Sequence, residues 1–190
     1  MKRSPQRQAI HQAQEILKER PVYLDTETTG MGKNDTVIEI AVLDADGRVL
    51  VNTLVQPRGS IPASSARIHG ITDEMANDAP PWPEVWVAVE RSLAGRTVAI
   101  YNVEFDLRVM KQTHTQHWMK WKLPSGARFV DVMELYAQYH GQWDPIRKRF
   151  RYLSLAQAGR RSGIPLPNTH RAKDDCLLTR ALLQYLADQR

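Results

Sequence analysis

Apolar and polar positions follow two different spacings along this chain of 190 residues. Apolar and β-branched runs predict strands at residues 22–25, 36–43, 49–55, 97–101 and 129–132. Apolar residues at helical spacing, together with cap residues, predict helices at residues 4–20, 62–69, 72–76, 82–93, 103–114, 133–139, 154–163 and 171–186. Three early strands followed by strand–helix alternation predict an α/β fold, with a mixed sheet and helices on its faces.

The chain is predicted to form one domain with a helix placed before it. Ser4 and Pro5 are typical of a helix start, and Pro21 ends that helix ahead of the first strand. We therefore expect a helical extension at residues 1–20 and one domain at residues 21–190, because no linker or internal repeat divides the chain.

The composition narrows the class of protein. With 42% apolar and 25% charged residues, the chain fits a globular fold and neither a fibre nor a disordered protein. A formal charge of +5 hints at a polyanionic partner. Cys176 is the only cysteine, which excludes an internal disulfide and favours the reducing cytoplasm. No apolar run is long enough to cross a membrane, and no signal peptide is expected at the basic N-terminus.

Two carboxylates follow the first apolar run, in the segment P-V-Y-L-D-T-E-T-T-G at residues 21–30. Asp25 and Glu27 are two positions apart, so a strand points both toward the same face. Such a pair repels unless a cation lies between its members, and a divalent cation needs further oxygen ligands. Four more acids stand near strand ends or helix starts, where ligands gather in α/β sheets, and spacing does not choose among them: Asp106, Asp131, Asp174 and Asp175.

His170 adds a group that takes up protons near neutral pH. It precedes Asp175 by five residues and follows Pro165 and Pro167. Five helical positions would put His170 and Asp175 on different faces, so His170 reaches the same site only from the loop that enters the last helix. There an imidazole is suited to take a proton from an attacking water.

Three motifs resemble those of the DEDDh 3′–5′ exonucleases, the family of the polymerase III epsilon subunit, ribonuclease T and exonuclease X. They are D-T-E-T-T-G, Y-N-V-E-F-D and H-R-A-K-D-D, with I-H-G-I-T at residues 68–72, and the resemblance covers residues 21–186. It implies a ribonuclease H-like fold, with five strands, one of them antiparallel, and helices on both faces. It also implies metal-dependent hydrolysis of phosphodiester bonds from the 3′ end of single-stranded DNA, with RNA as the alternative substrate and nucleoside 5′-monophosphates as products.

The resemblance assigns roles residue by residue. It implies two Mg²⁺ or Mn²⁺ ions held by Asp25, Glu27, Asp106 and Asp175. It makes His170 the general base. Asp131 then matches a structural aspartate at a helix start, and Asp174 a neighbour of the ligand.

Several further residues match positions near the terminal nucleotide, where a substrate contact and a structural role both stay open: Thr28, His69, Asn102 and Phe105. Tyr101 and Val103 replace the histidine and alanine of the usual H-N-A-x-F-D motif, which changes the pocket near that nucleotide. Glu39 stands inside an apolar strand, where a buried acid must be paired or neutral, and the resemblance implies a structural role. Trp118 and Trp121 are expected in the core or at its rim.

Residues 143–152 combine cations with aromatic rings. The cations are Arg147, Lys148, Arg149 and Arg151, and the rings are Trp143, Phe150 and Tyr152. Proteins that bind single-stranded nucleic acid typically use cations that contact phosphates and aromatic rings that stack on bases. A solvated charged loop is the other interpretation, and closeness to the third motif favours nucleic acid.

Two other functions fit the same residues. One is a proofreading subunit that works only when bound to a polymerase, and the other is a nucleic-acid-binding module without catalysis. Proofreading subunits often carry a docking tail, whereas this chain ends at Arg190, directly after the last predicted helix, which favours an independent nuclease. The full set of acids favours catalysis.

Overall fold

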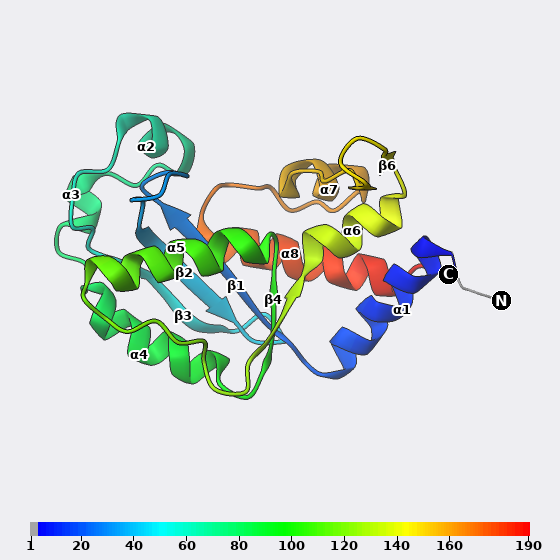
Figure 1. Cartoon of the computed structure of the whole chain (residues 1–190), viewed down its shortest axis with the longest axis horizontal. Helices are drawn as coiled ribbons and strands as arrows, with labels where there is room; N and C mark the ends of the chain where they lie inside the picture. Colours follow the sequence, from blue (N-terminus) through cyan, green and yellow to red (C-terminus); the bar gives the residue numbers. More distant parts are fainter. Residues whose placement is uncertain (1–3) are drawn as a thin grey trace.

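The computed structural model describes residues 4–190 and contains a five-stranded sheet with helices on both faces (Figure 1). The strand order is β3-β2-β1-β4-β5. The strands are β1 (Val22–Thr28), β2 (Val37–Leu43), β3 (Val49–Leu54), β4 (Thr97–Ile100) and β5 (Arg128–Asp131). β2 runs antiparallel to β1 and β3, whereas β1, β4 and β5 are parallel. The predicted mixed sheet with one antiparallel strand is therefore confirmed.

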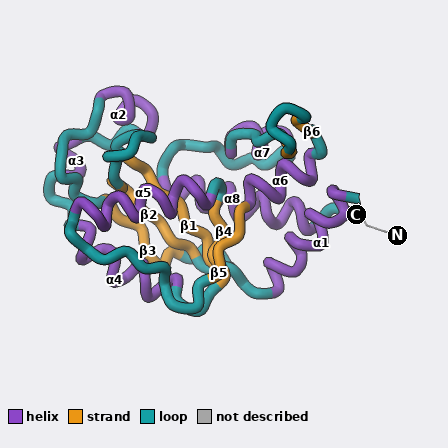
Figure 2. Tube along the Cα trace, viewed as in Figure 1, coloured by secondary structure: helices purple, strands orange, loops and turns teal. Residues whose placement is uncertain are grey.

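The helices form two layers around this sheet (Figure 2). The larger ones are α1 (Pro5–Lys18), α4 (Trp82–Leu93), α5 (Val103–Gln116), α6 (Val132–His140), α7 (Leu155–Arg161) and α8 (Ala172–Ala187). Helices α4 and α5 pack on one face, and α1, α6, α7 and α8 pack on the other. The short helices α2 (Ala63–His69) and α3 (Asp73–Ala76) flank a small separate apolar cluster.

Neighbouring residues of β1 point into different cores. Tyr23 packs on the side of α8, whereas Val22 and Leu24 pack on the side of α4 and α5. Because side chains alternate along a strand, Asp25 and Glu27 continue the Tyr23 face and point toward α8. The strand itself therefore sends both carboxylates to one face of the sheet.

Helix α1 packs its apolar face into the same core as α8. The Ser4 hydroxyl accepts a hydrogen bond from the Arg7 N–H and caps the helix, as predicted. Ala13 and Ile16 are buried in that core. The division of the chain at residue 20 stays a prediction, and residues 1–3 of the proposed extension lie outside the described residues.

The structure differs from the predicted elements at two places that matter for the site. β1 continues to Thr28, beyond the predicted end at Asp25, because its pairing with β2 extends through Glu27 and Thr28. A two-stranded hairpin of β6 (Trp143–Asp144) and β7 (Arg149–Phe150) was not predicted, since strands of two residues carry no periodicity. Within residues 4–190, no helix combines the length and apolar content needed to cross a bilayer.

Candidate active site

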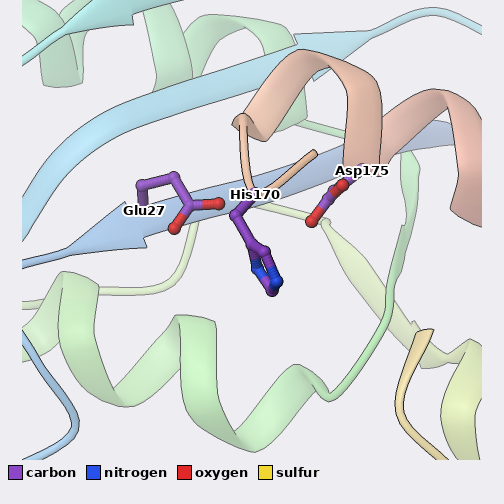
Figure 3. Close-up of side chains that lie close together, drawn as sticks. All are labelled: Glu27, His170 and Asp175. Atoms are coloured by element: carbon purple, nitrogen blue, oxygen red, sulfur yellow. The ribbon is translucent and has the colours of Figure 1, made fainter. Parts of the chain in front are cut away.

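A cleft of about 660 Å³ opens at the C-terminal end of β1, next to the first turns of α5 and α8. Its walls include the five predicted catalytic residues: Asp25, Glu27, Asp106, His170 and Asp175. Glu27, His170 and Asp175 each offer one ligand atom, and these atoms lie within 4.8 Å of one another. Figure 3 shows these three side chains side by side, from the end of β1 and the start of α8. Residues from three distant segments of the chain therefore meet in one cleft.

Asp106 reaches the cleft from the first turn of α5. Its side chain is 2% exposed, and its Oδ1 accepts a hydrogen bond from the Thr26 hydroxyl at 2.7 Å. Thr26 lies between Asp25 and Glu27 in β1, on the opposite face of the strand. This bond therefore ties the start of α5 to the segment that carries the first two carboxylates.

The start of α8 is fixed by an ion pair between a partly exposed arginine and a buried glutamate. Arg171, the N-cap residue, offers no capping side chain to its own helix and instead binds Glu39 of β2. The Arg171 Nη2 lies 2.6 Å from Glu39 Oε1, and its Nε lies 3.1 Å from both carboxylate oxygens. Glu39 Oε2 also accepts the Ala172 N–H at 2.9 Å, so Glu39 caps the helix from another strand. The predicted pairing of this buried acid is confirmed.

His170 and Asp175 stand on either side of this anchor. His170 directly precedes Arg171 and has a left-handed backbone with φ of 53°, outside the helix as predicted. Asp175 lies in the first turn, and its Oδ2 accepts a hydrogen bond from the Asn168 amide. Asp175 Oδ1 is buried and has no hydrogen-bond partner among the described residues. A buried carboxylate oxygen without a partner is costly unless a cation satisfies it.

Burial raises the pKa of all four carboxylates, and the charges of neighbouring site acids add to this at Asp25 and Glu27. Burial, followed by the charges of Asp106 and Asp175, raises the pKa of Asp25 well above its ordinary value. Burial with the charge of Asp175 raises the pKa of Glu27 to about 8, and burial raises those of Asp106 and Asp175 to about 7 and about 6. Four acids that disfavour their own ionisation, one with an unpartnered oxygen, fit a site for divalent cations, which prefer oxygen ligands.

The predicted nucleotide-contacting residues Thr28, His69, Asn102 and Phe105 also line the cleft. The Thr28 hydroxyl donates to the Gly30 carbonyl at 2.7 Å. His69 Nδ1 accepts the Ile71 N–H at 3.0 Å, which leaves the proton of the neutral ring on Nε2. Nε2 is buried and makes no hydrogen bond of normal geometry among residues 4–190, although burial lowers the pKa of the ring and the Thr28 backbone partly offsets this.

The four predicted basic residues lie outside the cleft, on and beside the β6–β7 hairpin. Arg147 pairs with Asp144 at 3.4 Å, and the Arg149 guanidinium lies 4.1 Å from the centre of the Tyr152 ring. Leu153 follows directly and lines the cleft. The hairpin therefore adjoins the rim of the cleft through residues 151–153.

Asp131 and Asp174, which the motif resemblance did not assign to the metal site, make structural contacts. Asp131 caps α6 by accepting the Met133 N–H at 2.9 Å, and it also accepts the Val103 N–H at 2.9 Å. It therefore joins the starts of α6 and α5. Asp174 accepts a hydrogen bond from the Thr169 hydroxyl at 2.8 Å. Sequence analysis missed two polar contacts to carboxylates of the site, Thr26 to Asp106 and Asn168 to Asp175, because only the fold brings these residues together.

Comparison with known proteins gives a consistent result. The RNase_T exonuclease model matches residues 22–183. The uncharacterized exonuclease CP81 of Escherichia phage 186 is 34% identical over 180 residues, covering 92% of both chains. A PolC-type DNA polymerase III of Clostridium perfringens is 29% identical over 180 residues, which are 93% of this chain but only 12% of the polymerase.

A solved structure of exonuclease X in complex with 5′ overhanging duplex DNA has a TM-score of 0.62 to this chain. It is 25% identical, and the match covers 86% of this chain and 89% of that one. The match confirms the ribonuclease H-like fold that the three motifs implied.

Proposed function

Because this chain belongs to the RNase_T family of exonucleases, we propose that it hydrolyses single-stranded DNA from the 3′ end and releases nucleoside 5′-monophosphates. RNA is the alternative substrate. The observation that carries the proposal is the convergence of four carboxylates and one imidazole in a single cleft. A nucleic-acid-binding module without catalysis would not need acids that destabilise one another.

The proposed mechanism divides the work among these residues. Asp25, Glu27, Asp106 and Asp175 would hold two Mg²⁺ or Mn²⁺ ions, which supply positive charge to the attacking water and the leaving 3′ oxygen. His170 takes a proton from the attacking water. The new bond joins the water oxygen to phosphorus while the bond to the 3′ oxygen breaks. The Glu39–Arg171 pair keeps His170 and Asp175 in place on either side of it.

Other residues are proposed to hold the strand. His69 Nε2–H donates to the terminal nucleotide, with Thr28, Asn102 and Phe105 around it. The hairpin cations Arg147, Lys148, Arg149 and Arg151 contact phosphates near the rim. The formal charge of +5 supports a polyanionic substrate. We place the enzyme in the cytoplasm, where its one cysteine, the buried Cys176, stays reduced.

Digestion of matched oligonucleotides tests the proposal. Single-stranded DNA and RNA of one sequence, labelled at the 5′ end, are incubated with Mg²⁺, with Mn²⁺ and with EDTA. We expect labelled products that shorten one nucleotide at a time from the 3′ end, with metal only, and with mononucleotides as the released product. Internal cleavage, shortening from the 5′ end, or equal activity in EDTA would contradict the proposal. The ratio of DNA to RNA cleavage identifies the substrate.

Association with a polymerase is a second candidate, favoured by the similarity to the polymerase PolC. In that case the chain is a proofreading activity and cleaves efficiently only in the complex. Tagged protein isolated from its own cells tests this candidate. Stoichiometric recovery of a polymerase, with activity that rises in the complex, would support it, and full activity of the isolated chain would count against it.

A further inference from the structure

Trp118 is the most exposed tryptophan of the chain. Its side chain is 84% exposed, whereas Trp82 and Trp86 are buried and Trp121 packs against Trp86. The expectation that Trp118 lies in the core or at its rim is therefore wrong. Its backbone is left-handed, with φ of 53°, which turns the ring outward just after the end of α5. A single exposed apolar side chain is ordinary by itself, so the residues around Trp118 decide what it can do.

A cation already lies on this ring. The Arg58 guanidinium is 4.2 Å from the centre of the Trp118 ring, and its Nη1 donates to the Gln116 carbonyl at the end of α5. The ring is thus held in position by a contact that leaves most of its surface open. An exposed ring beside a guanidinium is the arrangement on which nucleic-acid bases stack.

Further cations lead from Trp118 back to the cleft. Glu104, Arg108, Lys111 and Thr115 are spaced so that they share one outward face of α5. Arg108 lies at the cleft end of this face, because its guanidinium is 5.2 Å from the centre of the Phe105 ring and Phe105 lines the cleft. Figure 1 shows α5 crossing the face of the sheet toward the side where α3 and α4 lie. The face therefore runs from the cleft to Thr115 in the last turn of α5, three residues before Trp118.

These cations have no carboxylate partner. Arg58, Arg108 and Lys111 form no ion pair among residues 4–190, and neither do Lys33, Lys120 and Lys122. Hydrogen bonds join their segments into one surface: Arg108 donates to the Gly32 carbonyl at 3.2 Å, and Gln116 donates to the Asn34 carbonyl at 2.6 Å. Glu104, at the cleft end, is the one acid of the α5 face.

We propose that Arg108, Lys111, Arg58 and Trp118, here called the α5 track, bind the body of the single strand whose 3′ end occupies the cleft. The cations contact phosphates, and a base stacks on Trp118. This inference rests on the proposed function, and it adds the path of the strand and a second anchoring point. The α5 track adjoins α5, whereas the β6–β7 hairpin packs against α6.

The length of α5 sets a size threshold for this contact. Phe105 and Gln116 are separated by roughly 17 Å along the helix, at about 1.5 Å per residue. A stacked strand rises about 3.4 Å per nucleotide, so Trp118 meets a base roughly five nucleotides from the 3′ end. Shorter strands fill the cleft without reaching Trp118, and only longer ones engage the whole α5 track.

Oligonucleotide length therefore provides the test. Oligo(dT) of four and of ten nucleotides is bound in EDTA, with affinity measured by fluorescence anisotropy. We expect Trp118→Ala to weaken binding of the longer oligonucleotide by about 5- to 100-fold, the range for losing one stacked base, and to leave the shorter one unchanged. Trp118→Phe should retain most of the affinity. Removing Arg58, Arg108 and Lys111 together should reduce the slope of log affinity against log salt by about 2.

Controls separate the possible outcomes. Arg7→Ala removes one exposed cation from α1, away from the α5 track. It should change neither the affinity for the oligonucleotides nor the salt slope. An equal effect of Trp118→Ala on both lengths, or none on either, would overturn the inference, as would a length-dependent loss caused by Trp143→Ala instead. Cleavage of the four-nucleotide strand in Mg²⁺ is read in parallel. If it persists in Trp118→Ala, the proposed function holds whatever the fate of the α5 track, and if wild type cleaves neither strand, the proposed function fails separately.

Discussion

Glu39 and Arg171 form an ion pair that joins the antiparallel strand β2 to the N-cap residue of the last helix, with Glu39 buried and Arg171 partly exposed. Glu39 is 3% exposed, and its two carboxylate oxygens accept from the Arg171 guanidinium and from the Ala172 N–H. Glu39 of β2 also lies directly opposite Glu27 of β1 in the register of the sheet. This places two acids on the same face of the sheet. Arg171 offsets that repulsion while it fixes the backbone between His170 and Asp175.

Loss of this pair should affect stability and catalysis together. Arg171→Ala leaves the buried Glu39 without its cation, with only the Ala172 N–H as a partner, and is expected to lower the free energy of unfolding by about 3 kcal/mol, measured by urea denaturation. Arg171→Lys keeps the charge but loses the bidentate contact with Glu39. Its free energy of unfolding should therefore lie between those of wild type and Arg171→Ala. Lys173→Ala, an exposed cation in the same turn of α8, is the matched control. Equal losses for Arg171→Ala and Lys173→Ala would show that the pair has no special role.

Metal should stabilise the protein most at high pH. The pKa of Glu27 is raised from 4.5 to about 8 and that of Asp175 from 3.8 to about 6. Between these ordinary and raised values the folded protein holds more protons than the unfolded chain, so in EDTA its stability falls as pH rises. The melting temperature in EDTA should therefore fall as the pH rises from about 5 to about 8. The increase in melting temperature that Mg²⁺ causes should grow over the same range. A melting temperature in EDTA that rises across this window would contradict the assignment, and Glu27→Gln should flatten the fall.

Removal of His170 should slow cleavage without loosening the fold. Its left-handed backbone is tolerated by asparagine, so His170→Asn removes the imidazole with little strain. We expect turnover to fall by about 10²–10⁴-fold, the usual contribution of a general base, with an unchanged melting temperature. His11→Asn, on the exposed face of α1, is the control. A loss below threefold would mean that another group accepts the proton.

The hairpin cations should not contribute equally to binding. Arg147 is paired with Asp144, whereas Arg151 forms no ion pair among the described residues. Arg151→Ala is therefore expected to lower the salt dependence of single-strand binding by about 0.7 in slope, one phosphate contact, and Arg147→Ala by less. Anisotropy titrations over a range of salt concentrations measure both. If both variants match Arg7→Ala, the hairpin is only a solvated surface.

The sequence predicted those features of the site that depend on local pattern. A period of two residues put Asp25 and Glu27 on one face, and the prolines before His170 put it in a loop. The roles of Asp106 and Asp175 came from motif resemblance, because nothing local distinguishes them from Asp131 and Asp174.

What could not be predicted depends on distant contacts or on very short elements. Nothing near Glu39 indicates that its partner is Arg171, and Asn168 meets Asp175 only through the fold. The β6–β7 hairpin is too short for a periodic signal. The exposure of Trp118 was not predicted, because local sequence does not indicate the left-handed backbone that follows α5.

Replacement of Asp25 tests the central claim most directly, because its carboxylate is influenced by all three other acids of the cleft. Asp25→Asn keeps the shape of the side chain and removes its charge. With Mg²⁺ and a 5′-labelled single strand, we predict no detectable shortening from the 3′ end, while binding of the same strand in EDTA stays close to that of wild type. Undiminished cleavage by Asp25→Asn would contradict the account.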